Sequence, residues 1–423
     1  MTREENEMLT KTGPGTPCGE LLRRYWQPAA LSEELAEGGA PLPVRLLGED
    51  LVLFRDDGGR PGLLGLHCSH RGADLSYGRV EDGGLRCIYH GWLYDIHGRC
   101  LDQPGEPGGG ERKDSIRHPA YPCIERSGAI FAYLGPGEPP LLPIFEFLTA
   151  SDDHVFVKKF YHECNYLQGN EGNIDLIHLS FLHHNRYRDA GGPPVPFVFS
   201  GRGASPGLES MEAEIAEFGV RICKIRKLEP DSQHLYLCTF LFPNAFAFPG
   251  PFNKNNGYGV NWHVPIDDTH HWLYDFSFSR DQTIDRKQWK ERAGLIPGYR
   301  LTRNKSNRYL QDRASMEKES FTGIEFSDFN AHDLCAVEGP GPIQDRTKEH
   351  LASTDATIVV SRKLILNAIR EVREGREPPY LVKDARQNRF PNILTYTGMI
   401  PKSKNWKEYF REPEVAGGCV WPR

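Results

Sequence analysis

The chain has 423 residues, of which 39% are hydrophobic, and a formal net charge of −6 at pH 7. This length exceeds what one average core organises, so we expect two domains that share an interface. An acidic balance offers no basic face to a phosphate backbone or an anionic bilayer, which excludes nucleic acid and membranes as expected partners.

The N-terminal segment, residues 1–14, is polar and acidic, whereas a secretory signal needs a basic start and an apolar stretch. No later segment runs for about 18 apolar residues without a charge, the minimum for a membrane span. The ten cysteines are scattered rather than spaced as a disulfide framework. We therefore expect a soluble, cytoplasmic protein.

In chain order, the first expected element is a short helix at residues 19–26, where Leu21, Leu22 and Tyr25 recur at helical spacing. Strand-like pieces separated by Gly and Asp follow and predict a small β-domain. These pieces are residues 44–47, 51–54, 63–66, 85–88 and 129–134. Dense Pro and Gly predict a surface loop at residues 104–110 and a linker at 135–143, with a domain boundary near residue 145.

Beyond this boundary, strand-like runs alternate with helical stretches. Strands are expected at residues 154–160, 221–226, 234–240 and 271–278, and helices at 164–182, 300–318 and 354–373. This mixture predicts an antiparallel sheet with helices packed against one face, an α+β fold class.

Two short segments of the β-domain each carry one cysteine and one histidine: Cys68 with His70, and Cys87 with His90. Four ligands converge if these two loops face one another. A [2Fe–2S] cluster in which two imidazoles replace two thiolates has a raised reduction potential, so it accepts electrons and passes them on. Glycines that follow each pair let the backbone turn, and Trp92 can shield such a cluster from water.

A structural zinc site is the alternative, because two cysteines and two histidines also suit zinc. Zinc motifs more often present a cysteine pair followed by a histidine pair, whereas each loop here mixes the two types. The pattern therefore favours the cluster. His67 and His97 have no partner pattern and are expected to be ordinary loop histidines.

A second constellation lies in the helical stretch 164–182 and just after it. One helix would project Asp175 and His178 on one face, and a bend near Leu182 would bring His183 to the same metal. Two histidines and one carboxylate leave coordination positions open on iron(II) for O₂ beside a substrate. The spacing of these residues in one apolar segment favours this reading over satisfied core histidines.

The third ligand must come from elsewhere, and we choose Asp333, with Glu338 and Asp345 as competitors. Asp175 is too close to His178 in sequence to be an ideal ligand, but it can orient an imidazole by hydrogen bonding. His184 is expected not to bind metal. The remaining histidines of this half are expected to be structural: His162, His263, His270, His271 and His332.

With both motifs in order, the sequence resembles the Rieske non-haem iron aromatic oxygenases over nearly the whole chain, most closely their phthalate-dioxygenase-like branch. The matching segments are Tyr166-Leu167-Gln168, Glu171-Gly172, Ile174 to His183, Gln311-Asp312-Arg313, Phe321 to Ile324 and residues 341–351. Two departures are Tyr166, where tryptophan is common, and Glu171, where other branches have asparagine. Neither is an expected ligand.

The resemblance implies a helical segment at residues 1–42 packed on the catalytic domain, a Rieske β-domain at 43–145 and a helix-grip catalytic domain at 146–423. It also implies a [2Fe–2S] cluster on the four loop residues and a mononuclear Fe(II) on His178, His183 and Asp333. The oligomer is expected to be a homotrimer or hexamer, in which Asp175 bridges His178 and His90 of a neighbouring subunit.

By the same resemblance, the chain is the terminal oxygenase component of a multicomponent enzyme. Electrons come from a separate NAD(P)H-dependent reductase and in some systems a ferredoxin, because no glycine-rich nucleotide motif follows a strand here. The leading substrate is a methoxylated lignin-derived aromatic acid, such as vanillate or dehydrodivanillate, which would be O-demethylated. The alternatives are a phthalate-type dihydroxylation and, outside enzymes, a Rieske electron carrier.

Three features of the sequence bear on substrate binding. The aromatic stretch at residues 240–252 is expected either to wall the substrate pocket or to pack inside the sheet. Arg186 and Arg221 are candidates to pair with a substrate carboxylate, with ordinary salt bridges as the alternative for each.

Overall fold

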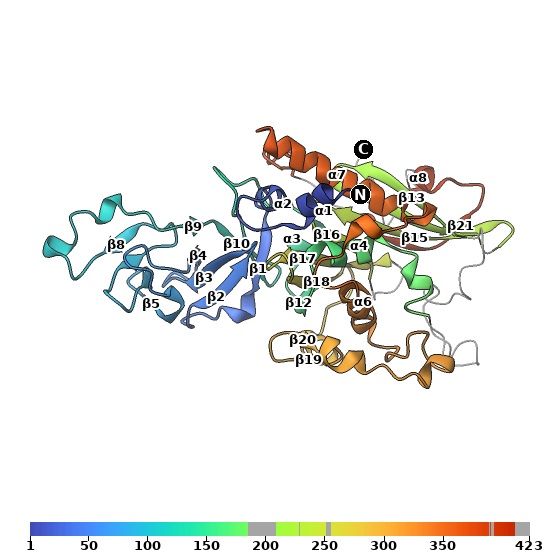
Figure 1. The fold of residues 1–423 in the computed structure, drawn as a ribbon, viewed down its shortest axis with the longest axis horizontal. Helices are drawn as coiled ribbons and strands as arrows, with labels where there is room; N and C mark the ends of the chain where they lie inside the picture. The colour runs from blue at the N-terminus through green and yellow to red at the C-terminus, as the bar shows by residue number, and fades with distance from the viewer. Residues whose placement is uncertain (185–208, 228, 251–254, 389, 391–392, 411–423) are drawn as a thin grey trace.

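The computed structural model describes residues 1–184, 209–227, 229–250, 255–388, 390 and 393–410. Within them the fold is α+β, as expected from the sequence: a smaller all-β lobe is joined to a larger lobe built on one antiparallel sheet. Figure 1 shows the smaller lobe extending to one side, with β5 and β8 at its outer end, while α4 and α6 lie in the larger lobe.

The smaller lobe consists of three antiparallel sheets, with strand orders β2-β3-β4-β9, β5-β6-β7-β8 and β1-β11-β10. Their bounds are β1 Gln27–Leu31, β2 Leu42–Leu46, β3 Glu49–Arg55, β4 Pro61–Gly65, β5 Arg79–Glu81, β6 Gly84–Arg86, β7 Leu93–Tyr94, β8 Cys100–Asp102, β9 Ala120–Tyr121, β10 Cys123–Arg126 and β11 Ala129–Ala132.

Strand β3 contributes side chains to two hydrophobic cores, one on each of its faces. Successive side chains of a strand point to opposite faces. Val52 and Phe54 therefore pack into a small core together with Cys68 and Cys87, whereas Leu53 on the other face joins the main core. The loops that carry the two cysteines are thus anchored on the inner side by buried apolar residues.

The expected strand at residues 85–88 is wrong at its end, since β6 stops at Arg86. Cys87 begins a tight loop there, and Ile88 and Tyr89 are exposed at its tip. The apolar character of these two residues made the loop look like a strand in the sequence.

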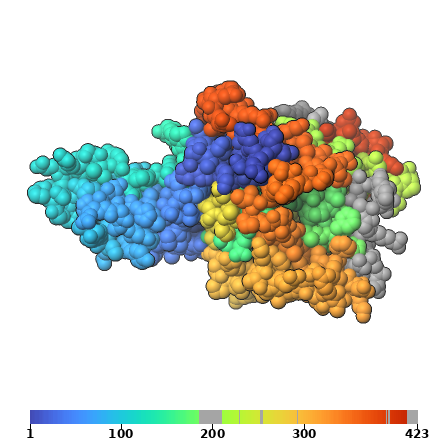
Figure 2. Space-filling model, in the orientation of Figure 1, coloured from blue at the N-terminus to red at the C-terminus, as the bar shows by residue number. Residues whose placement is uncertain are grey.

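The first 42 residues contribute helices and a strand. Helices α1 (Arg3–Thr10) and α2 (Pro17–Leu22) pack on α7 of the larger lobe, and Figure 2 shows this N-terminal segment lying against it. Strand β1 pairs with β11. The expected helix at 19–26 starts earlier and ends earlier, because Thr16 caps Gly19 and a proline occupies the first helical turn.

The larger lobe is built on an eight-stranded antiparallel sheet of order β12-β18-β17-β16-β15-β14-β13, in which β21 also pairs with β15. Its strands are β12 Val155–His162, β13 Glu209–Ala216, β14 Gly219–Arg226, β15 Ser232–Leu241, β16 Ala245–Pro249, β17 Gly257–Pro265, β18 His271–Ser279 and β21 Tyr396–Pro401. All four strands expected here are confirmed.

Helices and short strands complete this lobe. They are α3 Glu146–Thr149, α4 Tyr166–Ile174, α5 Arg286–Arg292, α6 Phe329–Glu338, α7 Ala356–Arg373, α8 Trp406–Tyr409, β19 Leu295–Ile296 and β20 Arg300–Leu301. Helix α4 lies across β16, β17 and β18, and α6 packs on α4. None of the described helices is long and apolar enough to cross a bilayer.

Two of the three helices expected in this lobe differ from the structure: the helix at 164–182 ends early, at Ile174, and the helix at 300–318 does not form. The helix at 354–373 is confirmed as α7. The helix at 300–318 is wrong: Arg308, Tyr309 and Leu310 have positive φ values of 53°, 57° and 49°, which interrupt any helix. Tyr309 is buried between exposed neighbours, so no continuous apolar face forms.

A buried ion-pair network fixes α4 in place. Glu171 accepts hydrogen bonds from Arg346 at 2.8 Å and from Arg362 of α7 at 2.6 Å. All three side chains are at most 9% exposed. Burial alone would raise the pKa of Glu171, but the two guanidinium groups outweigh it and hold that pKa below the ordinary value. The charged pairs thus tie α4 to the helix that covers it.

We expect Glu171→Ala to lower the free energy of unfolding by about 3–5 kcal/mol, because two buried guanidinium groups lose their carboxylate. The Glu171 contribution is complete above pH about 4.5, the ordinary glutamate pKa, and is lost as pH falls through the lower folded value. Denaturant unfolding at several pH values measures both effects. As a control, Glu377→Ala removes an exposed partner of Lys383 and should change stability by less than about 0.5 kcal/mol.

Candidate metal centres

The two cysteine–histidine loops of the smaller lobe have the same backbone design. Each closes with two main-chain hydrogen bonds and a glycine in the left-handed region, Gly72 at φ +76° and Gly91 at φ +75°. The four bonds run from Cys68 N to Ala73 O at 2.8 Å, Gly72 N to Cys68 O at 2.8 Å, Cys87 N to Trp92 O at 2.8 Å and Gly91 N to Cys87 O at 3.0 Å. A side chain at either glycine would be strained.

The structure brings the four predicted cluster residues together. The rings of His70 and His90 lie 4.6 Å apart, and Trp92 stacks on His70 at 4.5 Å with an interplanar angle of 6°. Cys68 and Cys87 are both buried, and their sulfurs lie close enough to interact. These loops join β4 to β5 and β6 to β7 in the smaller lobe, and Figure 1 shows β5 at the outer end of that lobe.

The donor set fits a metal cluster. His70 Nδ1 is buried and, among the described atoms, has no hydrogen-bond partner, which costs free energy unless a metal binds it. Burial, with a further contribution from the Cys68 sulfur, raises the pKa of the Cys87 thiol. A cation beside the Cys87 sulfur would favour its thiolate form. Two thiolates and two imidazoles suit a Rieske-type [2Fe–2S] cluster, and by chemistry alone also zinc.

The Tyr94 hydroxyl and the Cys68 sulfur lie 3.2 Å apart inside the small core, and the hydroxyl is the donor when the sulfur is a cluster-bound thiolate. A donor at a ligating sulfur stabilises the more negative, reduced cluster. Tyr94→Phe removes this hydrogen bond, worth about 1 kcal/mol. We therefore expect the reduction potential of the cluster to fall by roughly 40 mV for one electron, as measured by spectroelectrochemical titration. Tyr121→Phe is the matched control, because the Tyr121 hydroxyl donates to Glu49 instead. The reduction potential of the cluster should be unchanged in this variant.

In the larger lobe, His178, His183 and Asp333 converge from two elements. Their ligand atoms all lie within 4.8 Å of one another. Asp333 Oδ1 is 3.0 Å from His183 Nε2 and 3.5 Å from His178 Nε2. Burial would raise the pKa of Asp333, but the two histidines outweigh it and lower that pKa, so the carboxylate is ionised. Two imidazoles and one carboxylate suit iron(II) with open coordination positions.

The backbone path to this site is a correction to the sequence analysis. Helix α4 ends at Ile174, and Asp175 is its extended C-cap with φ −76° and ψ 98°. His178 then begins a short 3-10 helix, His178–Ser180. Asp175 and His178 therefore do not share a helix face. The Asp175 carboxylate bonds to Ile177 N at 2.9 Å and so stabilises the turn that ends the helix.

Hydrogen bonds orient both histidines. His178 Nδ1 donates to the main-chain carbonyl of Asp175, rather than to its carboxylate as expected, which leaves Nε2 facing Asp333. His332 lies against His183, with their Nδ1 atoms 3.3 Å apart, and its own ring faces two main-chain carbonyls, Leu182 O at 3.0 Å from Nδ1 and Ile324 O at 3.2 Å from Nε2. Carbonyl or imidazole partners of this kind are the usual second neighbours of metal-binding histidines.

Two of these supporting residues were not predicted from the sequence. His332 was expected to be structural only. Lys224 on β14 is fully buried and donates to Leu176 O at 3.1 Å and to Ser180 Oγ at 2.6 Å, so it holds the 3-10 turn that carries His178. A lysine in the middle of a strand whose neighbours are apolar was the available signal.

The competing carboxylates lie elsewhere. Glu338 is buried, but it accepts bonds from Tyr309 Oη at 2.5 Å and from Glu163 N at 2.7 Å. Asp345 caps Thr347 N and pairs with Lys348 on the surface. Neither belongs to the group of His178, His183 and Asp333. His184 is not part of that group either.

A hollow of about 670 Å³, measured to its open mouth, lies on one side of this group. Its wall is mostly apolar and includes Leu176, Leu179, Tyr236, Phe246, Phe248 and Phe329, with Asn173, Asn261, Asp275 and Asn330 as polar members. Phe246 and Phe248 come from the aromatic stretch that was expected to wall a pocket, while Phe240 and Phe242 pack in the core. Residues 251–252 of that stretch lie outside the described residues.

A second hollow is lined by His178 and Asp333 and also by Asp175. The two hollows therefore share two of the proposed ligands in their walls. Of the arginines suggested for a substrate carboxylate, Arg186 lies outside the described residues. Arg221 pairs with Glu214 at 3.5 Å and Glu217 at 3.6 Å and does not line either hollow.

Comparison with known proteins identifies the lineage. Residues 25–121 match the Rieske [2Fe-2S] domain family, and residues 132–418 match the LigXa C-terminal domain like family. The oxygenase subunit of phthalate 4,5-dioxygenase from Pseudomonas putida is 34% identical over 97% of this chain and 94% of its own. The chain belongs to the Rieske non-haem iron oxygenases. It is therefore a terminal oxygenase subunit, an oxidoreductase that incorporates oxygen from O₂.

Two further similarities place this Rieske oxygenase among its relatives. The oxygenase subunit of 5,5'-dehydrodivanillate O-demethylase from a Sphingobium species is 31% identical over 92% of this chain and 85% of its own. The terminal oxygenase of carbazole 1,9a-dioxygenase from Nocardioides aromaticivorans IC177 has the same fold, with a TM-score of 0.59 and 22% identity over 87% of this chain and 98% of its own. The family carries a [2Fe–2S] cluster and a mononuclear iron.

Proposed function

We propose that Cys68, His70, Cys87 and His90 hold the [2Fe–2S] cluster, and that His178, His183 and Asp333 hold the mononuclear iron. The main support is the convergence of the three donors at the junction of two hollows. A Rieske electron carrier would need only the first set. Nothing in such a carrier accounts for a buried second metal site beside an apolar pocket.

When bound, the cluster supplies single electrons and the iron supplies open positions for O₂. The chain's own residues do the rest. The carbonyl of Asp175 fixes the proton position on His178, the ring of His332 packs against His183, and Lys224 holds the turn that carries His178. The apolar walls of the first hollow exclude water, which limits side reactions of activated oxygen.

Electrons are proposed to arrive from the Asp175 side. The second hollow is lined by Asp175, His178 and Asp333. Within one chain, the cluster loops lie in the smaller lobe and α4 in the other lobe, so a neighbouring subunit is the better donor. We propose a homotrimer or hexamer in which Asp175 bridges His178 and a neighbour's His90. A separate NAD(P)H-dependent reductase, with or without a ferredoxin, supplies these electrons in the cytoplasm.

For the substrate we propose a methoxylated aromatic carboxylate. Aromatic side chains line the pocket, and two buried cations lie near the wall residue Tyr236: in the β14–β15 ladder, Lys224 pairs with Tyr236 and Arg226 with His234. These four side chains share the face that Tyr236 presents to the pocket. Burial first, and then the nearby Arg226 and Lys224, lower the pKa of His234 to about 4. The relatives named for phthalate and dehydrodivanillate act on aromatic acids, in keeping with this choice.

Product analysis tests this choice. The oxygenase, reduced through a surrogate reductase, is given methoxybenzoates, vanillate, dehydrodivanillate and phthalate. O-demethylation hydroxylates the methoxy carbon, and the resulting hemiacetal loses formaldehyde. Formaldehyde in step with O₂ uptake is expected, whereas diols from phthalate without any formaldehyde would replace this proposal by dihydroxylation.

Arg226 gives a separate test of the substrate's charge. We expect Arg226→Gln to raise KM for aromatic acids about 10-fold or more, equivalent to roughly 1.5 kcal/mol for a lost bond to a charged group. KM for the corresponding methyl ester should change much less. Equal effects on acid and ester would assign Arg226 a structural role instead.

A further inference from the structure

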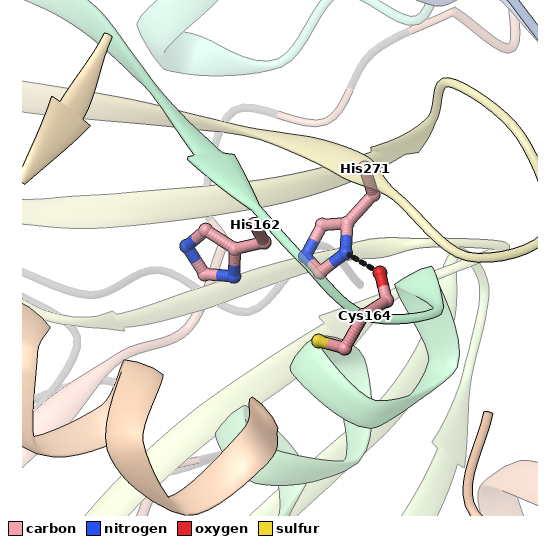
Figure 3. Close-up of side chains that lie close together, drawn as sticks. All are labelled: His162, Cys164 and His271. Atoms are coloured by element: carbon pink, nitrogen blue, oxygen red, sulfur yellow. Dashed lines mark hydrogen bonds between the residues drawn. The ribbon is translucent and has the colours of Figure 1, made fainter. Parts of the chain in front are cut away.

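A third cluster of metal-binding side chains lies outside both iron sites. His162 ends β12 and His271 begins β18, directly opposite one another in the ladder, and Cys164 follows two residues after His162. Ligand atoms of these three residues all lie within 4.8 Å of one another, and the three side chains are buried. Figure 3 shows the His162 and His271 rings side by side, with the Cys164 sulfur beneath them.

The hydrogen bonds of these histidines locate their lone pairs. Each neutral ring has one N–H group and one lone pair. His271 Nδ1 donates to the carbonyl of Cys164 at 2.8 Å, so the His271 lone pair is on Nε2 (Figure 3).

His263 on β17 directs a second nitrogen lone pair toward His271 Nε2. Its Nε2 donates to Asn173 Oδ1 at 2.8 Å, which leaves the lone pair on Nδ1. His263 Nδ1 and His271 Nε2 lie 3.1 Å apart. Two acceptors at this distance repel one another unless a cation lies beside both. A carbonyl or amide acceptor on the far nitrogen is the usual arrangement around metal-binding histidines.

Helix α4 leaves room at this point. A Cβ at Gly169 would lie 2.5 Å from His263 Nδ1 and 2.8 Å from His271 Nε2, so only glycine lets the two nitrogens face the helix. His162 adds an unsatisfied group: its Nδ1 is buried and, within the described part of the chain, has no hydrogen-bond partner.

We propose that His162, Cys164 and His271 bind a zinc ion, and that His263, which lies 3.1 Å from His271 Nε2 but outside that three-residue group, moves toward the ion as the fourth ligand. One thiolate and three imidazoles form a closed tetrahedral set, the pattern of structural rather than catalytic zinc. Binding releases the Cys164 proton to solvent and involves no redox change. Oxygen-rich sets suit magnesium or calcium, and this set contains no oxygen ligand.

This zinc site has a consequence for the substrate pocket. Asn173 lines the pocket beside His178 and accepts the bond from His263. With His263 bound to zinc through Nδ1, Asn173 keeps its oxygen on His263 and turns its amide N–H groups away from that ring. If Asn173 instead turned its nitrogen to His263, then His263 would donate to His271, and the residues would form a metal-free hydrogen-bond chain.

Zinc K-edge absorption of the full-length protein distinguishes these two arrangements. The protein is loaded with iron and its cluster, exposed to zinc and dialysed against a mild chelator. We expect one retained zinc per chain with one sulfur at about 2.3 Å and three nitrogens at about 2.0–2.1 Å. Two sulfurs would instead place the zinc on Cys68 and Cys87, and no retained zinc would establish the metal-free chain. Either result overturns the proposal.

Variants test which residues hold the ion. Cys164→Ala and His162→Phe are expected to lose the retained zinc, while Cys238→Ala, an equally buried cysteine of β15, keeps it. A strong chelator should lower the melting temperature of the wild type and not that of Cys164→Ala. Zinc retained with unchanged stoichiometry in Cys164→Ala would refute the assignment. Iron, sulfide and the reduced-cluster signal, measured in the same samples, show separately whether the two proposed iron sites are intact.

Discussion

Replacing His178 with alanine is expected to abolish product formation and to remove the mononuclear iron, while the visible spectrum of the cluster is kept. Loss of outer hydrogen-bonding partners already costs about 10–100-fold in metal affinity or activity, so loss of a ligand should cost more than about 100-fold. The cluster is held in a different lobe by a different core, which is why its spectrum should not change. Iron analysis, product yield and the absorption spectrum are measured on one preparation.

His184→Ala is the matched control for this experiment. His184 lies on the same segment and is almost as buried as His183, but it is not part of the three-residue group. The control should keep its iron and most of its activity. If His178→Ala kept full activity, or if both variants lost iron equally, the assignment of His178 as a ligand would be wrong.

Asp175→Asn is expected to slow turnover by about 10–100-fold with iron content and cluster unchanged. The Asp175 side chain lines the second hollow, and its carbonyl orients His178. Asparagine keeps the size of the side chain and its bond to Ile177 N but removes the negative charge. The step affected should be electron transfer from the cluster to the iron, not substrate binding.

Single-turnover kinetics isolates that step. The prereduced variant is mixed with substrate and O₂, and reoxidation of the cluster is followed by its absorption. Slow reoxidation at an unchanged substrate affinity is the expected outcome. Asp345→Asn, at an exposed 3-10 cap, is the control and should reoxidise as fast as the wild type. Normal reoxidation with weakened substrate affinity in Asp175→Asn would move Asp175 from the electron path to the substrate pocket.

The cluster loops were the most predictable part of this protein, because their chemistry is local in sequence. Each loop needs a cysteine, a histidine and a glycine with positive φ within a few residues, and Gly72 and Gly91 are found in that conformation. The strand β3 nearby was also predicted from the sequence, since its apolar side chains point alternately into two hydrophobic cores. The end of β6 was missed because Ile88 and Tyr89 are apolar but exposed, and short strands such as β5, β7, β8 and β9 were not predicted.

The second site was predicted as a set of residues but not as a backbone path. A continuous apolar segment indicated one helix over residues 164–182, whereas α4 stops at Ile174. The break depends on long-range contacts: Glu171 binds Arg346 and Arg362, and Lys224 binds Leu176 O and Ser180. Such partners lie far away in the chain, so local spacing cannot reveal them.

Histidines gave the least information when taken singly. His332 supports His183 from α6, and His162, His263 and His271 meet at one corner of the sheet. Their proximity follows from the pairing of β12, β17 and β18, which fixes the register of each strand. The sequence contains no repeated spacing among them, so this cluster became visible only once the sheet was known.

The central claim is that one chain holds two different iron centres. The most direct test is a count of iron and acid-labile sulfide in the purified, iron-replete protein, combined with electron paramagnetic resonance after reduction. The account predicts three irons and two sulfides per chain, together with a Rieske-type signal from the mixed thiolate–imidazole cluster. Absence of that signal, or zinc bound by Cys68 and Cys87 in place of the iron–sulfur pair, would contradict it.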